Sequence, residues 1–160
     1  MSTRQQAVSK DFLREVSLFD GMTDNQLSQL FRIGKVLNFK PGEIILNEGQ
    51  EGGKLYIMID GRAEVVKAGK DPNAQPKYLA DLSRGSVFGE MSVFDDAPCS
   101  ASIKAAGECA VHMIKGDDFK GFLKKNPEIA YNVFCTLIRQ FSSRLRRTNL
   151  ALTLLDFGSQ

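Results

Sequence analysis

The segment FGEMSVFDDAPCSASI, residues 88–103, combines residue types that can hold a small anion. Gly89 and Glu90 open a short helical turn, and a proline closes it before small and hydroxyl-bearing residues lead into a strand. The first turn of a helix exposes unpaired N–H groups and a partial positive charge, both of which attract phosphate. Ser100 can donate its hydroxyl to a phosphate oxygen, and Ala101 can donate its backbone N–H. The pattern therefore predicts an anion-binding segment, named here the anion loop.

The anion loop contains no lysine or arginine, and Cys99 occupies the position directly before the Ser100–Ala101 pair. A neutral thiol is a weak donor and cannot make the two-pronged, charge-assisted contact that an arginine makes with phosphate. Cys99 has two interpretations, an inert small residue or a reactive thiol activated by nearby amides. The first is favoured because most lone cysteines are inert. The loop is therefore expected to bind anions only weakly.

Cations outside the anion loop are candidate substitutes for the missing charge. Lys104 lies about 16 Å from Cys99 along an extended strand, which is too far for its side chain to return to the loop. Arg84 lies in a turn and Arg62 follows a hairpin turn, so both are expected to be solvated. A further group on the C-terminal helix is expected to form its solvated face: Arg139, Arg144, Arg146 and Arg147. No substitute is evident, and the long helix stays open as a source of one.

The other chemistry-bearing residues form no catalytic or metal-binding set. His112 is the single histidine, and it lies in an apolar strand where a structural role is predicted. The three cysteines are odd in number and widely spaced, which argues against a disulfide framework and against a zinc site. Asp95 and Asp96 form a turn pair of the kind that is usually solvated. With no nucleophile–base set and no glycine-rich triphosphate loop, the chain is not predicted to be an enzyme.

Length and composition are those of a globular protein without a membrane segment. The chain has 160 residues, of which 42% are hydrophobic and 25% charged, and this suits one domain with an appended helix. The net charge of +2 is too small to indicate a general nucleic-acid or membrane partner. No apolar run reaches the ~18 residues that span a membrane, and the N-terminus lacks the apolar core of a signal peptide. A cytoplasmic, reduced protein is expected.

The elements that position the anion loop are predicted to be helices flanking a set of short strands. Residues 1–34 are expected to be helical, with a capping box formed by Thr23 and Gln26. Between residues 35 and 115, short apolar runs alternate with glycine turns, and the run Leu55–Ile59 is apolar on both faces. This spacing predicts an α+β fold built on an antiparallel β-roll or jelly-roll barrel of about eight short strands. The anion loop adds one short helix within the strands.

Residues 116–152 are predicted to form a short helix and then a long amphipathic helix that begins at Pro127. The long helix carries one apolar stripe: Ile129, Val133, Phe134, Leu137, Ile138, Phe141 and Leu145. This stripe either covers the barrel or forms a parallel homodimer seam through residues 127–152. Residues 153–160 are expected to be a tail, and no DNA-reading helix-turn-helix is expected after the long helix.

Two stretches carry a more specific pattern. The first is PGEIILNEG at residues 41–49, followed by LYIMIDGRAEV at residues 55–65. The second is FGEMS at residues 88–92, together with Pro98 and the small residues 100–102. Taken together over nearly the whole chain, these motifs resemble the cyclic-nucleotide-binding domain family. That family includes the regulatory subunits of the cyclic-AMP-dependent kinase and the bacterial catabolite activator protein.

The resemblance implies that the anion loop is a phosphate-binding cassette. In the family pattern, the glutamate at position 90 binds a sugar 2′-hydroxyl, and position 99 is an arginine that pairs with the cyclic phosphate. Cys99 departs from this pattern, and losing one partner of such a pair costs about 2–5 kcal/mol, or roughly one and a half to three and a half decades of affinity. The candidate ligand-binding residues are Phe88, Gly89, Glu90, Met91, Cys99, Ser100 and Ala101.

The resemblance further implies a stand-alone sensor that requires no cofactor. Cyclic AMP, cyclic GMP or another small anion would bind weakly, and movement of the C-terminal helix would signal to an effector protein. The alternative is a degenerate protein-interaction module with the same fold, whose pocket is empty or filled by the chain's own tail at Leu154–Phe157. A thiol-based redox sensor that uses Cys99 is a third, more distant interpretation.

Overall fold

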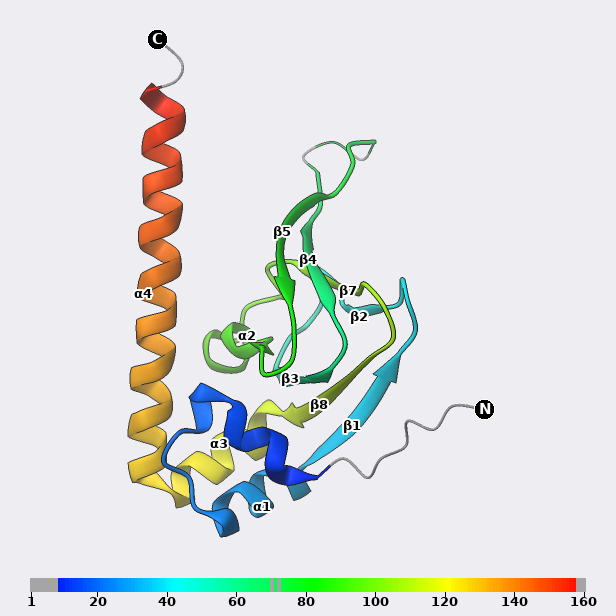
Figure 1. Ribbon diagram of the computed structural model, residues 1–160. Coiled ribbons are helices and arrows are strands. Elements are labelled where there is room, and N and C mark those ends of the chain that lie inside the picture. Colours follow the sequence, from blue (N-terminus) through cyan, green and yellow to red (C-terminus); the bar gives the residue numbers. More distant parts are fainter. Residues whose placement is uncertain (1–8, 70, 72, 158–160) are drawn as a thin grey trace.

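The strands form two four-stranded antiparallel sheets that enclose a common core (Figure 1). The structure is a computed structural model that describes residues 9–69, 71 and 73–157, the last three by backbone alone. One sheet contains, in order, β1 (Gly34–Phe39), β8 (Cys109–Lys115), β3 (Lys54–Asp60) and β6 (Val87–Phe88). The other contains β2 (Ile44–Leu46), β7 (Ser102–Ala105), β4 (Ala63–Lys67) and β5 (Lys77–Leu82). The predicted antiparallel β-roll is confirmed.

The strand β3 is buried on both faces because its alternating side chains enter two separate hydrophobic clusters. Leu55, Ile57 and Ile59 belong to the cluster that the strand forms with the helices. Tyr56 and Met58 belong to the cluster between the two sheets. Successive side chains of a strand point to opposite faces, so the run that is apolar on both faces is the strand that separates the two cores, as the sequence predicted.

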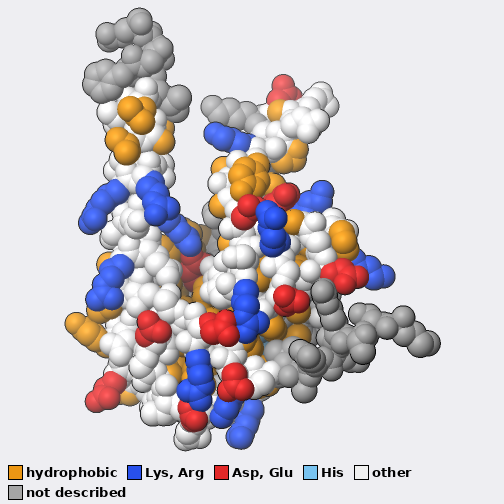
Figure 2. Space-filling model, viewed as in Figure 1, with side chains coloured by type: hydrophobic (Ala, Val, Ile, Leu, Met, Phe, Trp, Pro, Cys, Tyr) orange, Lys and Arg blue, Asp and Glu red, His pale blue; other side chains and the backbone are white. Residues whose placement is uncertain are grey.

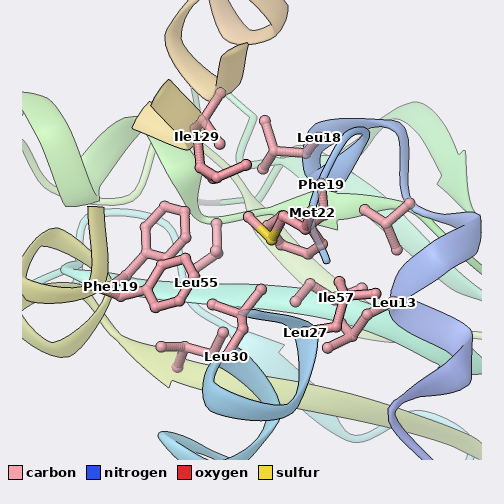
Figure 3. Packing of buried hydrophobic residues seen from close by; sticks show 14 of the residues in the cluster. Leu13, Leu18, Phe19, Met22, Leu27, Leu30, Leu55, Ile57, Phe119 and Ile129 are labelled. Carbon is pink, nitrogen blue, oxygen red and sulfur yellow. The ribbon is translucent and has the colours of Figure 1, made fainter. Parts of the chain in front are cut away.

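Helices cover the outer face of the sheet that contains β3 (Figure 1). They are η1 (Lys10–Glu15), η2 (Ser17–Phe19), α1 (Asp24–Arg32), α3 (Gly116–Lys125) and the first half of α4 (Pro127–Phe157). Figure 3 shows Leu13 and Leu27 of the N-terminal helices packing with Ile57 of β3, while Phe119 of α3 lies close to Leu55. These contacts fix the base of the roll, from which α4 rises.

The start of α1 is closed by the predicted capping box. The Thr23 hydroxyl accepts a hydrogen bond from the backbone N–H of Gln26 at 3.3 Å, and the Gln26 side chain accepts one from the Thr23 N–H at 2.9 Å. Two of the free N–H groups at the helix start are thereby satisfied. The long helix α4 begins at Pro127, where the missing N–H of proline has no cost.

The two halves of α4 have different surroundings, because the helix continues past the roll (Figure 1). Ile129, Val133 and Leu137 in its first half are buried. The exposed apolar residues of the helix are Tyr131, Phe134, Ile138, Leu145, Leu150, Leu152 and Leu154. The helix continues to Phe157, beyond the expected end at residue 152. Part of the predicted apolar stripe therefore covers the core, and part is left exposed.

Figure 1 also shows that the hairpin of β4 and β5 extends away from the body of the roll. Tyr78 and Leu79 on β5 are about half exposed, at 54% and 49%.

Within the described ranges, α4 included, we find no helix with an apolar stretch of the length that a bilayer requires.

Candidate functional site

The anion loop forms a short helix, α2 (Glu90–Asp95), directly after β6. Gly89 precedes the helix in the left-handed conformation, with φ of 76°. A Cβ at this position would collide with the backbone carbonyl oxygen of Lys54 on β3. Only glycine fits here, because the residue combines a left-handed backbone with a close approach to a neighbouring strand.

Ser92 attaches α2 to the loop between β2 and β3. Its side chain is buried, accepts the N–H of Gly53 at 3.1 Å and donates to the carbonyl of Gly89 at 3.0 Å. Gly52 packs so closely that a Cβ there would collide with the Ser92 side chain. The first end of the anion loop is therefore held by buried side-chain contacts.

The second end of the anion loop is held by the same β2–β3 loop, but through main-chain bonds. The Cys99 N–H donates to the Gln50 carbonyl at 2.9 Å, and the Gly49 N–H donates to the Cys99 carbonyl at 2.8 Å. The Cys99 residue is only 8% exposed, whereas Ser100 is exposed and Ala101 is half-buried. The structure thus brings both ends of the loop against one neighbouring segment.

Phe88 and Met91 differ in exposure. Phe88 is buried and stacks on Tyr56, with ring centroids 5.2 Å apart, whereas Met91 is 44% exposed. Burial raises the pKa of Tyr56, and the nearby Cys99 adds to this shift. Tyr56 therefore lies behind the loop, close to both of its ends, and Met91 points to the surface.

Glu90 is the buried acid of the site, and its partner comes from α4. The residue is 4% exposed, and its Oε1 accepts a hydrogen bond from Nη1 of Arg144 at 2.9 Å. Figure 2 shows basic side chains gathered on the middle of α4, and the Arg144 guanidinium lies 5.8 Å from the centroid of the Phe141 ring. Arg144 is exposed, as expected for the solvated face of the helix, but it is also ion-paired with a buried carboxylate, which was not predicted from the sequence.

Sequence reasoning missed the Glu90–Arg144 pair, although a signal for it exists. Leu137, Phe141 and Arg144 follow one another at gaps of four and three, which places them on one face of a helix. Leu137 is buried and Phe141 packs against the core. The face that holds the apolar stripe is consequently the face that carries the arginine.

The cations considered from the sequence lie elsewhere. Arg84 binds the Glu15 carboxylate with Nε and Nη2 at 2.7 and 2.8 Å, and its Nη1 donates to a β3 carbonyl at 2.7 Å. The Arg84 side chain is about half exposed, and its contacts fasten η1 to β3. Arg62 forms an exposed ion pair with the β5 strand at 3.1 Å. Lys104 is exposed on β7 between two residues that point into the core.

Lys67 is a second cation beside the anion loop that sequence reasoning missed. Its Nζ donates to the Ser100 carbonyl at 2.6 Å and pairs with Glu48 at 2.7 Å. The bond from the Ala68 N–H and the pairing with Lys67 hold the pKa of Glu48 below its usual value. The sequence feature that could have indicated this position is the alternation of side chains along β4. It places Lys67 on the same face of the strand as Ala63, which belongs to the core between the sheets.

His112 has the predicted structural position. It is fully buried, its Nε2 lies 3.0 Å from the Phe31 carbonyl oxygen, and its ring stacks on the Phe31 ring at 5.1 Å. Burial lowers the pKa of His112. Across the described residues, no three histidine, cysteine, aspartate or glutamate side chains are grouped in a way that could hold a metal ion.

Known proteins are similar to this chain in sequence and in fold. The CRP-like cAMP-activated global transcriptional regulator of Mycobacterium tuberculosis is 27% identical over 147 residues, which cover 92% of this chain and 63% of that protein. The cGMP-dependent protein kinase of Plasmodium berghei is 35% identical over 112 residues, which cover 69% of this chain and 12% of the kinase. The crystal structure of the Thermus thermophilus catabolite activator protein superposes with a TM-score of 0.75 at 28% identity, covering 88% of this chain and 63% of that one.

The chain spans less than two thirds of the length of each of these relatives. The model of the cyclic nucleotide-binding domain family matches residues 36–126, which is more than half of the 160 residues. The matched range contains the whole anion loop and every strand except the first two residues of β1. The chain belongs to the cyclic nucleotide-binding domain family.

Proposed function

We propose that this chain is a regulatory sensor whose anion loop binds a cyclic nucleotide weakly and passes the binding event to α4. The observation that carries the proposal is the buried Glu90 carboxylate, which faces an arginine of α4. A buried acceptor suits a ligand hydroxyl. The similarity to proteins named for cAMP activation and for cGMP dependence supports a sugar-phosphate ligand. The proposal includes no cofactor and no catalytic activity.

Weak binding is expected because the anion loop supplies no cation of its own. The phosphate-pairing position holds the Cys99 thiol, which is 8% exposed. Among the described residues, three cations reach the loop, and each already pairs with a carboxylate: Arg144 at 2.9 Å, Lys67 at 2.7 Å and Lys120 at 3.6 Å. The charge of these cations is therefore already partly neutralised, which weakens the attraction that an anionic ligand experiences at the loop.

The helix α4 is the proposed output element. It touches the anion loop through the Glu90–Arg144 pair and through Phe94 of α2, whose ring packs edge-on against Phe134 at 5.4 Å. A ligand that alters α2 can therefore change the position of α4. We propose that the exposed apolar residues of α4 serve an effector protein or a homodimer through residues 127–152, in the cytoplasm, where the free cysteines would stay reduced.

A degenerate protein-interaction module is the second candidate, and Cys99 favours it. Arg144 already neutralises Glu90, so the loop needs no ligand to satisfy its buried charge. The idea that the tail plugs the pocket gains no support from Leu154, which is 64% exposed where α4 extends past the roll (Figure 1). The side chains of residues 155–157 lie outside the described set.

Isothermal titration calorimetry with cyclic AMP and cyclic GMP tests the proposed function. The protein concentration must be high enough to detect submillimolar affinity, and 5′-AMP is the matched ligand without the phosphate ring. We expect the wild-type protein to bind at least one cyclic nucleotide and Glu90→Gln to bind it less well. If neither the wild type nor Cys99→Arg binds, the sensor proposal fails and the interaction module is preferred.

A further inference from the structure

We infer that Arg144 of α4 supplies the phosphate-pairing cation that the anion loop lacks at Cys99. This inference rests on the proposed function, because it assigns a role in binding the same cyclic nucleotide. The bound phosphate then lies between the loop and the helix. Ligand binding consequently strengthens the attachment of α4 to the roll instead of releasing the helix.

The Glu90–Arg144 pair leaves both partners with capacity for a ligand. Arg144 uses Nη1 to bind Glu90 Oε1, and a guanidinium has five N–H donors in total. Among the described residues, no hydrogen bond reaches the other carboxylate oxygen, Glu90 Oε2. A cyclic nucleotide has a group for each of them. Its sugar hydroxyl can donate to the free carboxylate oxygen, and its charged phosphate can accept hydrogen bonds from the remaining guanidinium donors.

Arg144 is accessible on the side that does not face Glu90. Its side chain is 56% exposed, whereas the side chain of Glu90 is 5% exposed. The Phe141 ring, 5.8 Å from the guanidinium carbon, favours an orientation over its face. A phosphate can therefore approach the arginine from solvent while the arginine remains paired with the buried acid.

Charge decides whether a ligand keeps or displaces Arg144. If the arginine left, the phosphate would lie beside a buried carboxylate whose cation had been removed, and an uncompensated buried charge is strongly unfavourable. Asp95 and Asp96 at the end of α2 add further negative charge. Lys120 neutralises part of it through an ion pair with Asp96 at 3.6 Å. An arginine shared between the phosphate and Glu90 is thus the more stable arrangement.

Lys67 is the competing source of positive charge. It contacts the Ser100 carbonyl at 2.6 Å, so it lies at the second end of the anion loop. An ammonium is a strongly hydrated point charge, whereas a guanidinium is more weakly hydrated and presents five donors in a planar fork that matches phosphate geometry. The Lys67 partner, Glu48, also lies in a more exposed position than Glu90. These differences favour Arg144, and the experiment below discriminates between the two.

The test compares calorimetric affinities for cyclic AMP and cyclic GMP among matched variants. Arg144→Gln is expected to weaken binding about 10- to 100-fold, which is the usual effect of losing a charge-assisted contact. Arg146→Gln is the matched control, because it removes an arginine two positions further along α4, on the opposite side of the helix. It is expected to change affinity no more than about twofold. Lys67→Gln is measured in the same series.

A rescue experiment shows whether Arg144 contacts the ligand or only holds the loop in shape. Cys99→Arg places an arginine inside the loop, so the double variant Cys99→Arg/Arg144→Gln is expected to recover at least the wild-type affinity. If Arg144 only held the loop in shape, the added arginine would not restore binding. Hydrogen exchange provides an independent readout, since the nucleotide is expected to raise the protection of α4 amides in the wild type but not in Arg144→Gln.

Several results would overturn the inference. Unchanged affinity in Arg144→Gln together with a loss in Lys67→Gln would assign the cation to β4 and leave the proposed function intact. A fall in α4 protection on binding would mean that the ligand releases the helix. Binding by Cys99→Arg with a silent wild type would show that Arg144 does not replace the missing arginine. Silence of both proteins would reject the proposed function itself, and the inference with it.

Discussion

The two ends of the anion loop are built in opposite ways. At the first end, Gly89 is pressed against β3, and the side chains of Glu90 and Ser92 are buried and hydrogen-bonded, Glu90 to the Arg144 side chain and Ser92 to the backbone of Gly53 and Gly89. At the second end, Cys99 is held by main-chain bonds, and the adjacent Ser100 is exposed. Main-chain bonds accept almost any side chain, whereas buried side-chain contacts specify one.

This difference would let the chain depart from the expected family pattern at position 99 without losing its fold. A substitution at position 99 changes the charge available to a ligand but leaves the backbone bonds to Gln50 and Gly49 in place. Under our proposal, the phosphate cation expected at the second end is supplied instead at the first, where Arg144 of α4 pairs with Glu90. The shape of the site and the source of its charge would then be separable in this molecule.

Gly89→Ala is expected to have the largest effect on stability and would test the rigid end directly. The added Cβ collides with the Lys54 carbonyl oxygen, and alanine is in addition strained by the left-handed backbone at this position. We expect the free energy of unfolding, measured by urea denaturation, to fall by about 2–4 kcal/mol. Gly49→Ala is the matched control, since its φ is 77° but nothing lies within 4 Å of an added Cβ, and we expect a loss of about 1 kcal/mol. Equal losses would mean that the contact with β3 does not matter.

Two serines give the next comparison, because each end of the loop carries one. Ser92→Ala leaves the half-buried Gly53 N–H without its hydrogen-bond partner, and we expect a loss of about 1–3 kcal/mol in thermal unfolding experiments. Ser100→Ala alters an exposed hydroxyl, so its cost should stay within about 0.5 kcal/mol. When the two variants are compared at the same fraction of folded protein, Ser100→Ala is expected to reduce nucleotide affinity more than Ser92→Ala does. A larger stability loss for Ser100→Ala would contradict the division between the two ends.

The parts of the structure that sequence reasoning predicted are those with local causes. The Thr23–Gln26 capping box, the helix start at Pro127 and the doubly apolar strand β3 each follow from residues within a few positions of one another. The position of Gly89 and Glu90 at the start of a short helix is equally local. For such features the spacing of residue types contains the whole physical cause.

The parts that sequence reasoning missed depend on how distant elements pack. Glu90 and Arg144 are 54 positions apart, and Lys67 and Ser100 are 33 positions apart. Their contacts require the angle at which α4 leaves the roll and the register of β4 against β7, neither of which can be derived from local periodicity. The helical spacing could place Arg144 on the packed face of α4, but it could not place Glu90 opposite that face.

Acid is expected to have the smallest effect, which can be tested at Glu48 beside the second end. Hydrogen bonds from the Ala68 N–H and from Lys67 hold the pKa of Glu48 below 4.5 in the folded protein. A carboxyl group whose pKa is lower folded than unfolded stabilises the fold above its unfolded pKa and loses that contribution as the pH falls. Wild type should therefore lose slightly more stability than Glu48→Gln when the pH is lowered through 4.5, as measured by the midpoint of thermal unfolding. The hydrogen bond from Arg84 also lowers the pKa of Glu15, so only the difference between the two proteins is informative.

Glu48→Gln also sharpens the comparison at neutral pH, because it releases Lys67 from its ion pair without adding a charge to the loop. If the cation for the ligand comes from the first end, this release should change cyclic nucleotide affinity no more than about twofold, the range of an ordinary surface substitution. A clear gain in affinity would mean that the freed lysine reaches the phosphate. In that case the second end would supply charge as well as shape, and Glu48 would be the residue that keeps the affinity of the natural protein low.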